Sequence, residues 1–129
     1  MASDDDRECI LVIEDDPLSL KLYGDLIRSR GYGLLTAADG ATGLDLARDQ
    51  KPDLIITDAR LPEHSGIEVC RALKSDPATR DIPILMLTAW PQLEANARAA
   101  GCDAFLVKPV PISVLWREVE GLIGRCAAR

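Results

Sequence analysis

The stretch Cys9-Ile-Leu-Val-Ile13 runs directly into Glu14-Asp-Asp-Pro17. Five apolar residues without polar alternation are typical of a strand that is buried on both faces, and such strands belong to parallel sheets. Asp16 before Pro17 marks a helix start, because aspartate caps free N–H groups and proline suits the first helical position. The stretch therefore predicts a buried strand, an acidic turn and a helix.

The same order recurs along the chain. Further apolar runs cover residues 54–57, 84–88 and 104–107, and a weaker run at 32–36 is a candidate edge strand. Helical patterns lie between and after them, over residues 17–30, 41–50, 66–75, 91–100 and 112–125. Strands that alternate with helices over short connections predict an α/β fold, a parallel sheet with helices on both faces.

Two of these helices carry specific expectations. Leu18, Leu22, Leu26 and Ile27 are expected to form the buried face of the first, which Gly31 ends. In the last helix, Trp116 is interpreted either as packing or as a partner contact, with neither favoured.

Composition limits the class of protein. The chain has 129 residues, of which 47% are hydrophobic and 28% charged, as in one globular domain. Its net charge of −6 argues against direct nucleic-acid binding and against an anionic membrane surface. No apolar run reaches the ~18 residues of a membrane span. We expect a cytoplasmic domain over residues 8–126, an acidic flexible tail over 1–7 and a C-terminal tail over 127–129.

The four cysteines fit this interpretation. Their spacing matches no zinc site, and no Cys-x-x-Cys motif is present. We expect all four to be reduced, small apolar residues, with burial of those inside apolar patterns; they are Cys9, Cys70, Cys102 and Cys126.

Polar residues follow the apolar runs. The residues concerned are Glu14, Asp15, Asp16, Asp58, Thr88 and Lys108. In a parallel sheet the carboxyl ends of the strands meet at one rim, where ligands bind. Clustered carboxylates need a cation, and Mg²⁺ suits oxygen ligands. With a lysine to hold phosphoryl oxygens, one carboxylate can act as a nucleophile on phosphorus.

Four strings carry a more specific resemblance. Ile13-Glu-Asp-Asp-Pro17, Thr57-Asp-Ala-Arg-Leu-Pro62 with Gly66, Leu87-Thr-Ala89 and Val107-Lys-Pro109 resemble the receiver domain of two-component response regulators. The resemblance covers nearly the whole chain. It implies a flavodoxin-like sandwich, a five-stranded parallel sheet in the order 2-1-3-4-5 with five helices.

The resemblance also implies roles for single residues. Asp58 would accept a phosphoryl group from a histidine kinase or a histidine phosphotransfer protein. Asp15, Asp58 and the backbone carbonyl of Arg60 would bind Mg²⁺, or alternatively Mn²⁺, and Glu14 would contact the metal through water. The remaining phosphoryl-binding and switch residues would be Lys108, Thr88, Ala89 and Phe105, with a cis bond between Lys108 and Pro109.

Such a chain would be a signalling switch rather than an enzyme, catalysing only its own phosphorylation and dephosphorylation. It would be a stand-alone regulator or a domain cut from a larger one. Its output would be a downstream effector protein, and the face formed by the fourth helix, fifth strand and fifth helix would also serve a possible homodimer.

Several positions depart from the family pattern. Phe105 stands where many relatives have tyrosine. Arg60 and Trp90 occupy positions that tune the phosphoryl lifetime, with Trp90 expected to shield the group and Arg60 to pair with Glu14 or the phosphoryl group. Pro111 precedes the last helix, so Ser113 is a candidate cap instead.

Two other function classes stay open at this point. A hydrolase of the aspartyl-phosphate type would need an aspartate two residues after the nucleophile, where this chain has Arg60. A flavin carrier would need a phosphate-binding loop after the first strand, where three acidic residues would repel a phosphate.

Overall fold

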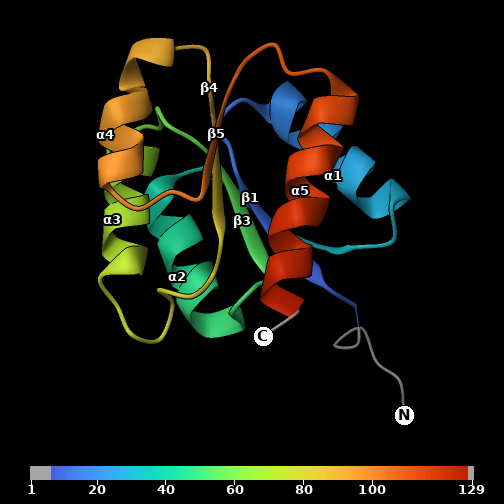
Figure 1. The fold of residues 1–129 in the computed structure, drawn as a ribbon, viewed down its shortest axis with the longest axis horizontal. Coiled ribbons are helices and arrows are strands. Elements are labelled where there is room, and N and C mark those ends of the chain that lie inside the picture. The colour runs from blue at the N-terminus through green and yellow to red at the C-terminus, as the bar shows by residue number, and fades with distance from the viewer. Residues whose placement is uncertain (1–6, 128–129) are drawn as a thin grey trace.

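The computed structural model describes residues 7–127 as five strands and five helices (Figure 1). The strands are β1 (Cys9–Ile13), β2 (Gly33–Ala37), β3 (Leu54–Asp58), β4 (Ile84–Thr88) and β5 (Ala104–Val107). The helices are α1 (Pro17–Ser29), α2 (Gly40–Gln50), α3 (Gly66–Lys74), α4 (Glu94–Ala99) and α5 (Ile112–Ala127). Of the tails expected at residues 1–7 and 127–129, residues 1–6 and 128–129 lie outside the described residues, and Ala127 is the last residue of α5.

The strands form one parallel sheet in the order β2-β1-β3-β4-β5. Helices α2, α3 and α4 cover one face, and α1 and α5 cover the other (Figure 1). Alternate residues of β1 enter the two layers: Leu11 and Ile13 pack on the first side, Ile10 and Val12 on the second. Burial of both faces explains the unbroken apolar run and confirms the predicted fold class.

The expected buried face of α1 is wrong in part. Leu18 is 76% exposed and Leu22 57% exposed, whereas Gly24 and Ile27 are buried. Tyr23 also packs against the core on this side. The sheet contacts the helix along the row that contains Tyr23, Gly24 and Ile27, and Leu26 also packs against the core. Of the expected face only Leu18 and Leu22 are exposed.

The predicted helix over residues 91–100 is also shorter than expected. Pro91–Leu93 forms a 3₁₀ turn, and α4 follows as six residues in which Ala97 alone is buried. A short helix with one buried alanine has little apolar area to hold it in place.

Helix α5 begins at Ile112, so Ser113 lies inside the first turn and is not the residue before it. The carbonyl of Pro111 accepts the N–H groups of Val114 and Leu115. Trp116 is only 4% exposed. Its ring stacks on Tyr32 at 6.4 Å between centroids, and the Arg30 guanidinium lies 4.5 Å from its centroid. These contacts decide in favour of packing.

Cys70 and Cys102 are buried free thiols and Cys9 is a half-buried one, while the side chain of Cys126 lies outside the described part of the chain. Within residues 7–127 no helix is both long and apolar enough to cross a bilayer.

Burial raises the pKa of Cys70 from 9.0 to about 12. Above pH 9 the unfolded thiol ionises while the folded one stays protonated, so the free energy of unfolding should fall between pH 9 and pH 12. We expect a shallower fall in Cys70→Ala, measured by urea unfolding at several alkaline pH values. Equal slopes in the two proteins would contradict a contribution from Cys70.

Candidate functional site

The parallel register brings the polar residues to one rim of the sheet. Asp58 is the last residue of β3 and lies opposite Leu87, while Thr88 ends β4 opposite Val107 of β5. Glu14 and Lys108 are the first residues after β1 and β5. Side chains that are up to 94 residues apart in the sequence therefore meet.

Lys108 is the centre of this cluster. Its Nζ lies 2.9 Å from Asp58 Oδ2 and 3.0 Å from Glu14 Oε1. The three side chains are 22%, 15% and 5% exposed, respectively. Burial alone would lower the pKa of Lys108, but its hydrogen bonds to the two carboxylates raise that pKa above its usual value. Lys108 is therefore a fixed positive charge at neutral pH.

Asp58 is held by its own strand and by the loop that follows. Its Oδ1 accepts the N–H of Arg60 at 3.0 Å, and its backbone carbonyl accepts the Thr57 hydroxyl at 3.0 Å. Gly66, the first residue of α3, passes very close to that carbonyl: a Cβ at Gly66 would lie 1.9 Å from the Asp58 oxygen. The start of α3 thus packs directly against the backbone that carries the carboxylate.

The three acidic residues of the turn after β1 have different environments. Glu14 is buried, and its Oε2 accepts the Asp16 N–H at 3.2 Å. Asp16 caps α1, accepting the Ser19 N–H and hydroxyl, and these hydrogen bonds lower the pKa of Asp16. Asp15 is exposed between them. The cap interpretation of Asp16 agrees with the sequence-based expectation.

Thr88 and Phe105 are both buried in this structure, whereas Ala89 is exposed. The Thr88 hydroxyl accepts the Trp90 N–H at 3.2 Å, and its carbonyl accepts the Lys108 N–H at 2.8 Å. The peptide bond between Lys108 and Pro109 is cis.

Arg60 does not pair with Glu14, which is bonded to Lys108. Instead the Arg60 guanidinium carbon lies 4.7 Å from the centroid of the Trp90 ring, a cation–π contact. This contact joins the loop after β3 to the loop after β4.

Sequence reasoning missed one neighbour of the site, Tyr23 on α1. The Lys108 Nζ lies 5.9 Å from the centroid of its ring, and burial raises the pKa of its hydroxyl. The available signal was an aromatic residue, Tyr23, on the helix that follows the acidic turn. It was missed because the expected buried face of that helix did not include it.

The site's oxygen donors suit a hard cation. In the described range no three His, Cys, Asp or Glu side chains gather as a metal site. Asp15 and Asp58 provide carboxylate oxygens and Arg60 provides a backbone carbonyl. These are ligand types that suit Mg²⁺, because this ion usually takes one or two carboxylates and completes its shell with water.

Comparison with known proteins agrees with this geometry. The response regulator receiver domain family matches residues 10–120. The polar-differentiation response regulator DivK of Brucella anthropi is 38% identical over 117 residues, which cover 89% of this chain and 95% of that protein.

Solved structures give the same result. The receiver domain of a Pseudomonas aeruginosa sensor histidine kinase, which holds a magnesium ion in its active-site cleft, is 32% identical with a TM-score of 0.85 over 92% of this chain and 98% of that one. The Thermotoga maritima response regulator TrrA, in complex with Mg²⁺ and BeF, is 28% identical with a TM-score of 0.82 over 89% and 98%.

These matches are to a family of regulatory domains, which decides against the hydrolase and the flavin carrier. With strand order, strand-end residues and relatives in agreement, the chain belongs to the response regulator receiver domain family of two-component signalling.

Proposed function

We propose that Asp58 accepts a phosphoryl group from a histidine kinase or a histidine phosphotransfer protein. The observation that carries the proposal is the Lys108 ammonium, which lies 2.9 Å from Asp58 Oδ2 at a partly open rim. Because its pKa is raised, Lys108 stays protonated at neutral pH and cannot act as a base. It supplies a fixed charge for phosphoryl oxygens.

In the proposed reaction an Asp58 carboxylate oxygen bonds to phosphorus while the bond from phosphorus to the donor's imidazole nitrogen breaks. The imidazole keeps that electron pair and takes up a proton. The product is an acyl phosphate whose negative charge lies beside Lys108. When bound to Asp15, Asp58 and the Arg60 carbonyl, Mg²⁺ would neutralise further charge.

The test is incubation with acetyl phosphate and Mg²⁺, followed by intact mass measurement. We expect a gain of one phosphoryl group, lost in Asp58→Asn and kept in Asp45→Asn, an exposed aspartate on α2. Turnover of the donor without a retained group would instead indicate a hydrolase. An unchanged mass would contradict the proposal.

Exposed apolar side chains favour a protein as the phosphoryl donor. Leu18, Leu22 and Ile112 are all more than half exposed. The two leucines lie in the first two turns of α1 and Ile112 begins α5, the helices that follow Glu14 and Lys108 in the chain. Apolar exposure of this kind around a reactive carboxylate suits docking of a protein surface.

The proposed switch starts from the buried positions of Thr88 and Phe105. In the proposed phosphorylated state the Thr88 hydroxyl turns from the Trp90 N–H to a phosphoryl oxygen, and Phe105 repacks on the same side. The face of α4, β5 and α5 would then present the change to an effector or to a second copy of the chain, with Val107 exposed on β5.

A cytoplasmic location belongs to the same proposal, since free thiols such as Cys70 and Cys102 stay reduced there.

The stacked pair Arg60–Trp90 is proposed to lengthen the phosphoryl lifetime by covering the acyl phosphate against water. Trp90→Ala or Arg60→Ala should speed loss of the group roughly twofold to fivefold, the factor that corresponds to a cation–π contact of about 0.5–1 kcal/mol. Decay of the phosphorylated mass with time measures this. Arg117→Ala, an exposed arginine on α5, is the control. Unchanged decay in both test variants would refute the shielding role.

A further inference from the structure

Strand β2 is an edge of the sheet, paired only with β1. The Gly33 N–H donates to Glu8, and the Ala37 carbonyl accepts the Glu14 N–H. In a parallel pair alternate residues bond to the neighbouring strand, so Gly33, Leu35 and Ala37 face β1. The N–H and C=O groups of Leu34 and Thr36 therefore point away from the sheet.

The edge lacks the features that usually protect such strands. Gly33–Ala37 contains no charged residue and no proline, and its register with β1 is continuous, without a bulge. Thr36 is exposed, and Leu34 and Leu35 are half-buried. Another extended chain therefore meets no barrier within the strand itself.

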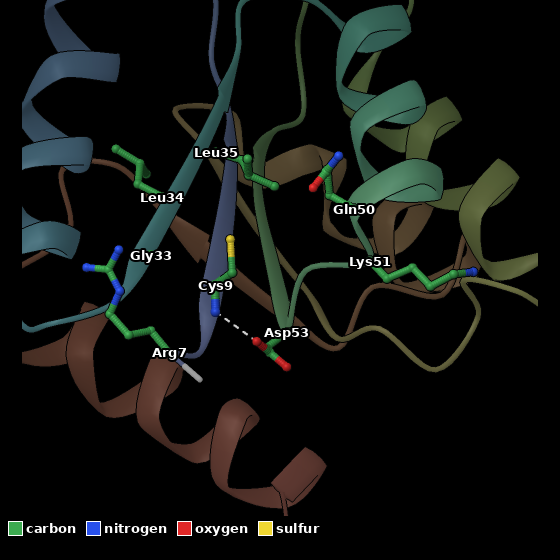
Figure 2. A pocket seen from close by; sticks show the side chains of 8 residues that line it. All are labelled: Arg7, Cys9, Gly33, Leu34, Leu35, Gln50, Lys51 and Asp53. Carbon is green, nitrogen blue, oxygen red and sulfur yellow. Dashed lines mark hydrogen bonds between the residues drawn. The ribbon is translucent and has the colours of Figure 1, made fainter. Parts of the chain in front are cut away.

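Hollows lie on both sides of this strand. Leu34 and Leu35 point to opposite sides of β2 (Figure 2). On the α1 side a hollow of about 310 Å³ lies between that helix and Leu34 and Thr36. A second hollow of about 460 Å³ is lined by Cys9 and Leu35 on the other side of the strand, and it also reaches Leu34 (Figure 2). Successive side chains of an added strand point to opposite faces, so they would enter the two hollows in turn.

Charge around the edge is opposite in sign to that of the whole chain. Lys21 and Arg28 line the α1 side together with one carboxylate, Asp25. Arg7 and Lys51 line the other hollow together with one carboxylate, Asp53, which accepts the Cys9 N–H. The carboxylate of Asp25 is already bonded to Lys21. This positive rim on a chain of net charge −6 suits an acidic segment, and it disfavours a second copy that would bring two positive edges together.

We propose that β2 binds an extended acidic peptide segment of a partner protein as a sixth strand. Main-chain hydrogen bonds to Leu34 and Thr36 would provide affinity, and the two hollows with their positive rim would select alternating apolar and acidic side chains. The proposed surface is separate from the Asp58 rim and does not depend on phosphoryl transfer.

The probe is a blocked seven-residue peptide of alternating valine and glutamate, titrated into the full chain and followed by amide NMR. We expect shifts at Leu34 and Thr36 and slower amide hydrogen exchange there. Thr36→Pro removes one outward N–H and should weaken binding at least tenfold. Thr36→Val keeps that N–H and should bind within twofold of the parent chain.

Two changes to the probe leave the protein untouched. Methylation of alternate peptide nitrogens should abolish binding, and lysine in place of glutamate should weaken it at least tenfold. These two peptide controls use the unchanged protein, so they test the proposal even if Thr36→Pro disturbs folding. The proposal is overturned by absence of binding up to millimolar peptide, by shifts centred elsewhere, or by equal binding of the methylated or lysine peptide.

Discussion

Replacing Gly66 with alanine is expected to lower the free energy of unfolding by roughly 3 kcal/mol or more. The new Cβ would lie 1.9 Å from the Asp58 carbonyl oxygen and 2.9 Å from its carbon, and backbone atoms cannot rotate away as a side chain can. The Gly66 N–H also donates to the Ala59 carbonyl at 3.0 Å, which holds the two segments together. Urea unfolding measures the loss.

Gly121→Ala is the matched control. It lies inside α5, and among the described residues no atom outside the backbone of its own helix lies within 4 Å of its would-be Cβ. Alanine should therefore stabilise the helix by about 0.5–1 kcal/mol. A loss of unfolding free energy at Gly66 and a gain at Gly121 would show that the close approach of the Asp58 backbone makes glycine necessary at position 66. A Gly66→Ala protein within about 1 kcal/mol of the parent would refute the clash.

Lys108→Met is expected to slow phosphoryl uptake by roughly 100-fold, the usual cost of removing a charge-stabilising donor from a transition state. This expectation rests on the proposed function of Asp58. The variant also leaves Glu14 and Asp58 near each other without the ammonium that lies 3.0 Å and 2.9 Å from them. Stability should fall as well, since like charges then repel in a partly buried site.

Two measurements separate these effects. Initial rates of mass gain with acetyl phosphate measure phosphoryl uptake. Thermal unfolding with and without Mg²⁺ measures how far the repulsion between Glu14 and Asp58 destabilises the protein. Excess Mg²⁺ should raise the unfolding midpoint of Lys108→Met more than that of the parent, because a cation can offset the same carboxylates. Lys21→Met, an exposed lysine bonded to Asp25, should change neither readout. Uptake in Lys108→Met within threefold of the parent would refute the role of Lys108.

Much of the site could be predicted because it depends on strand ends. Asp58 and Lys108 are 50 residues apart, yet each follows a buried apolar run, and parallel strands end at the same rim. The cap at Asp16 was equally readable, since capping uses only residues within one turn.

Other features needed distances between segments. Arg60 was expected to pair with Glu14 or with a phosphoryl group. The Glu14 alternative is wrong, because Glu14 pairs with Lys108 while Arg60 lies over the Trp90 ring, and the phosphoryl alternative stays a prediction. Leu18 and Leu22 of α1 looked apolar enough to be buried, yet both are exposed, and the sheet contacts Tyr23 and Ile27 instead. In both cases the local sequence allowed two arrangements, one for the partner of Arg60 and one for the buried row of α1, and tertiary packing determined which of them formed.

By itself, the sequence determined four buried strands, a candidate edge strand, the helices between and after them and the polar residues at the strand ends. These depend on periodicity and capping within a few residues of chain. Only the tertiary structure decided which carboxylates Lys108 holds, how closely Gly66 approaches Asp58, and that two hollows border the edge strand β2. Those features depend on distances between segments remote in the chain, which no local pattern encodes.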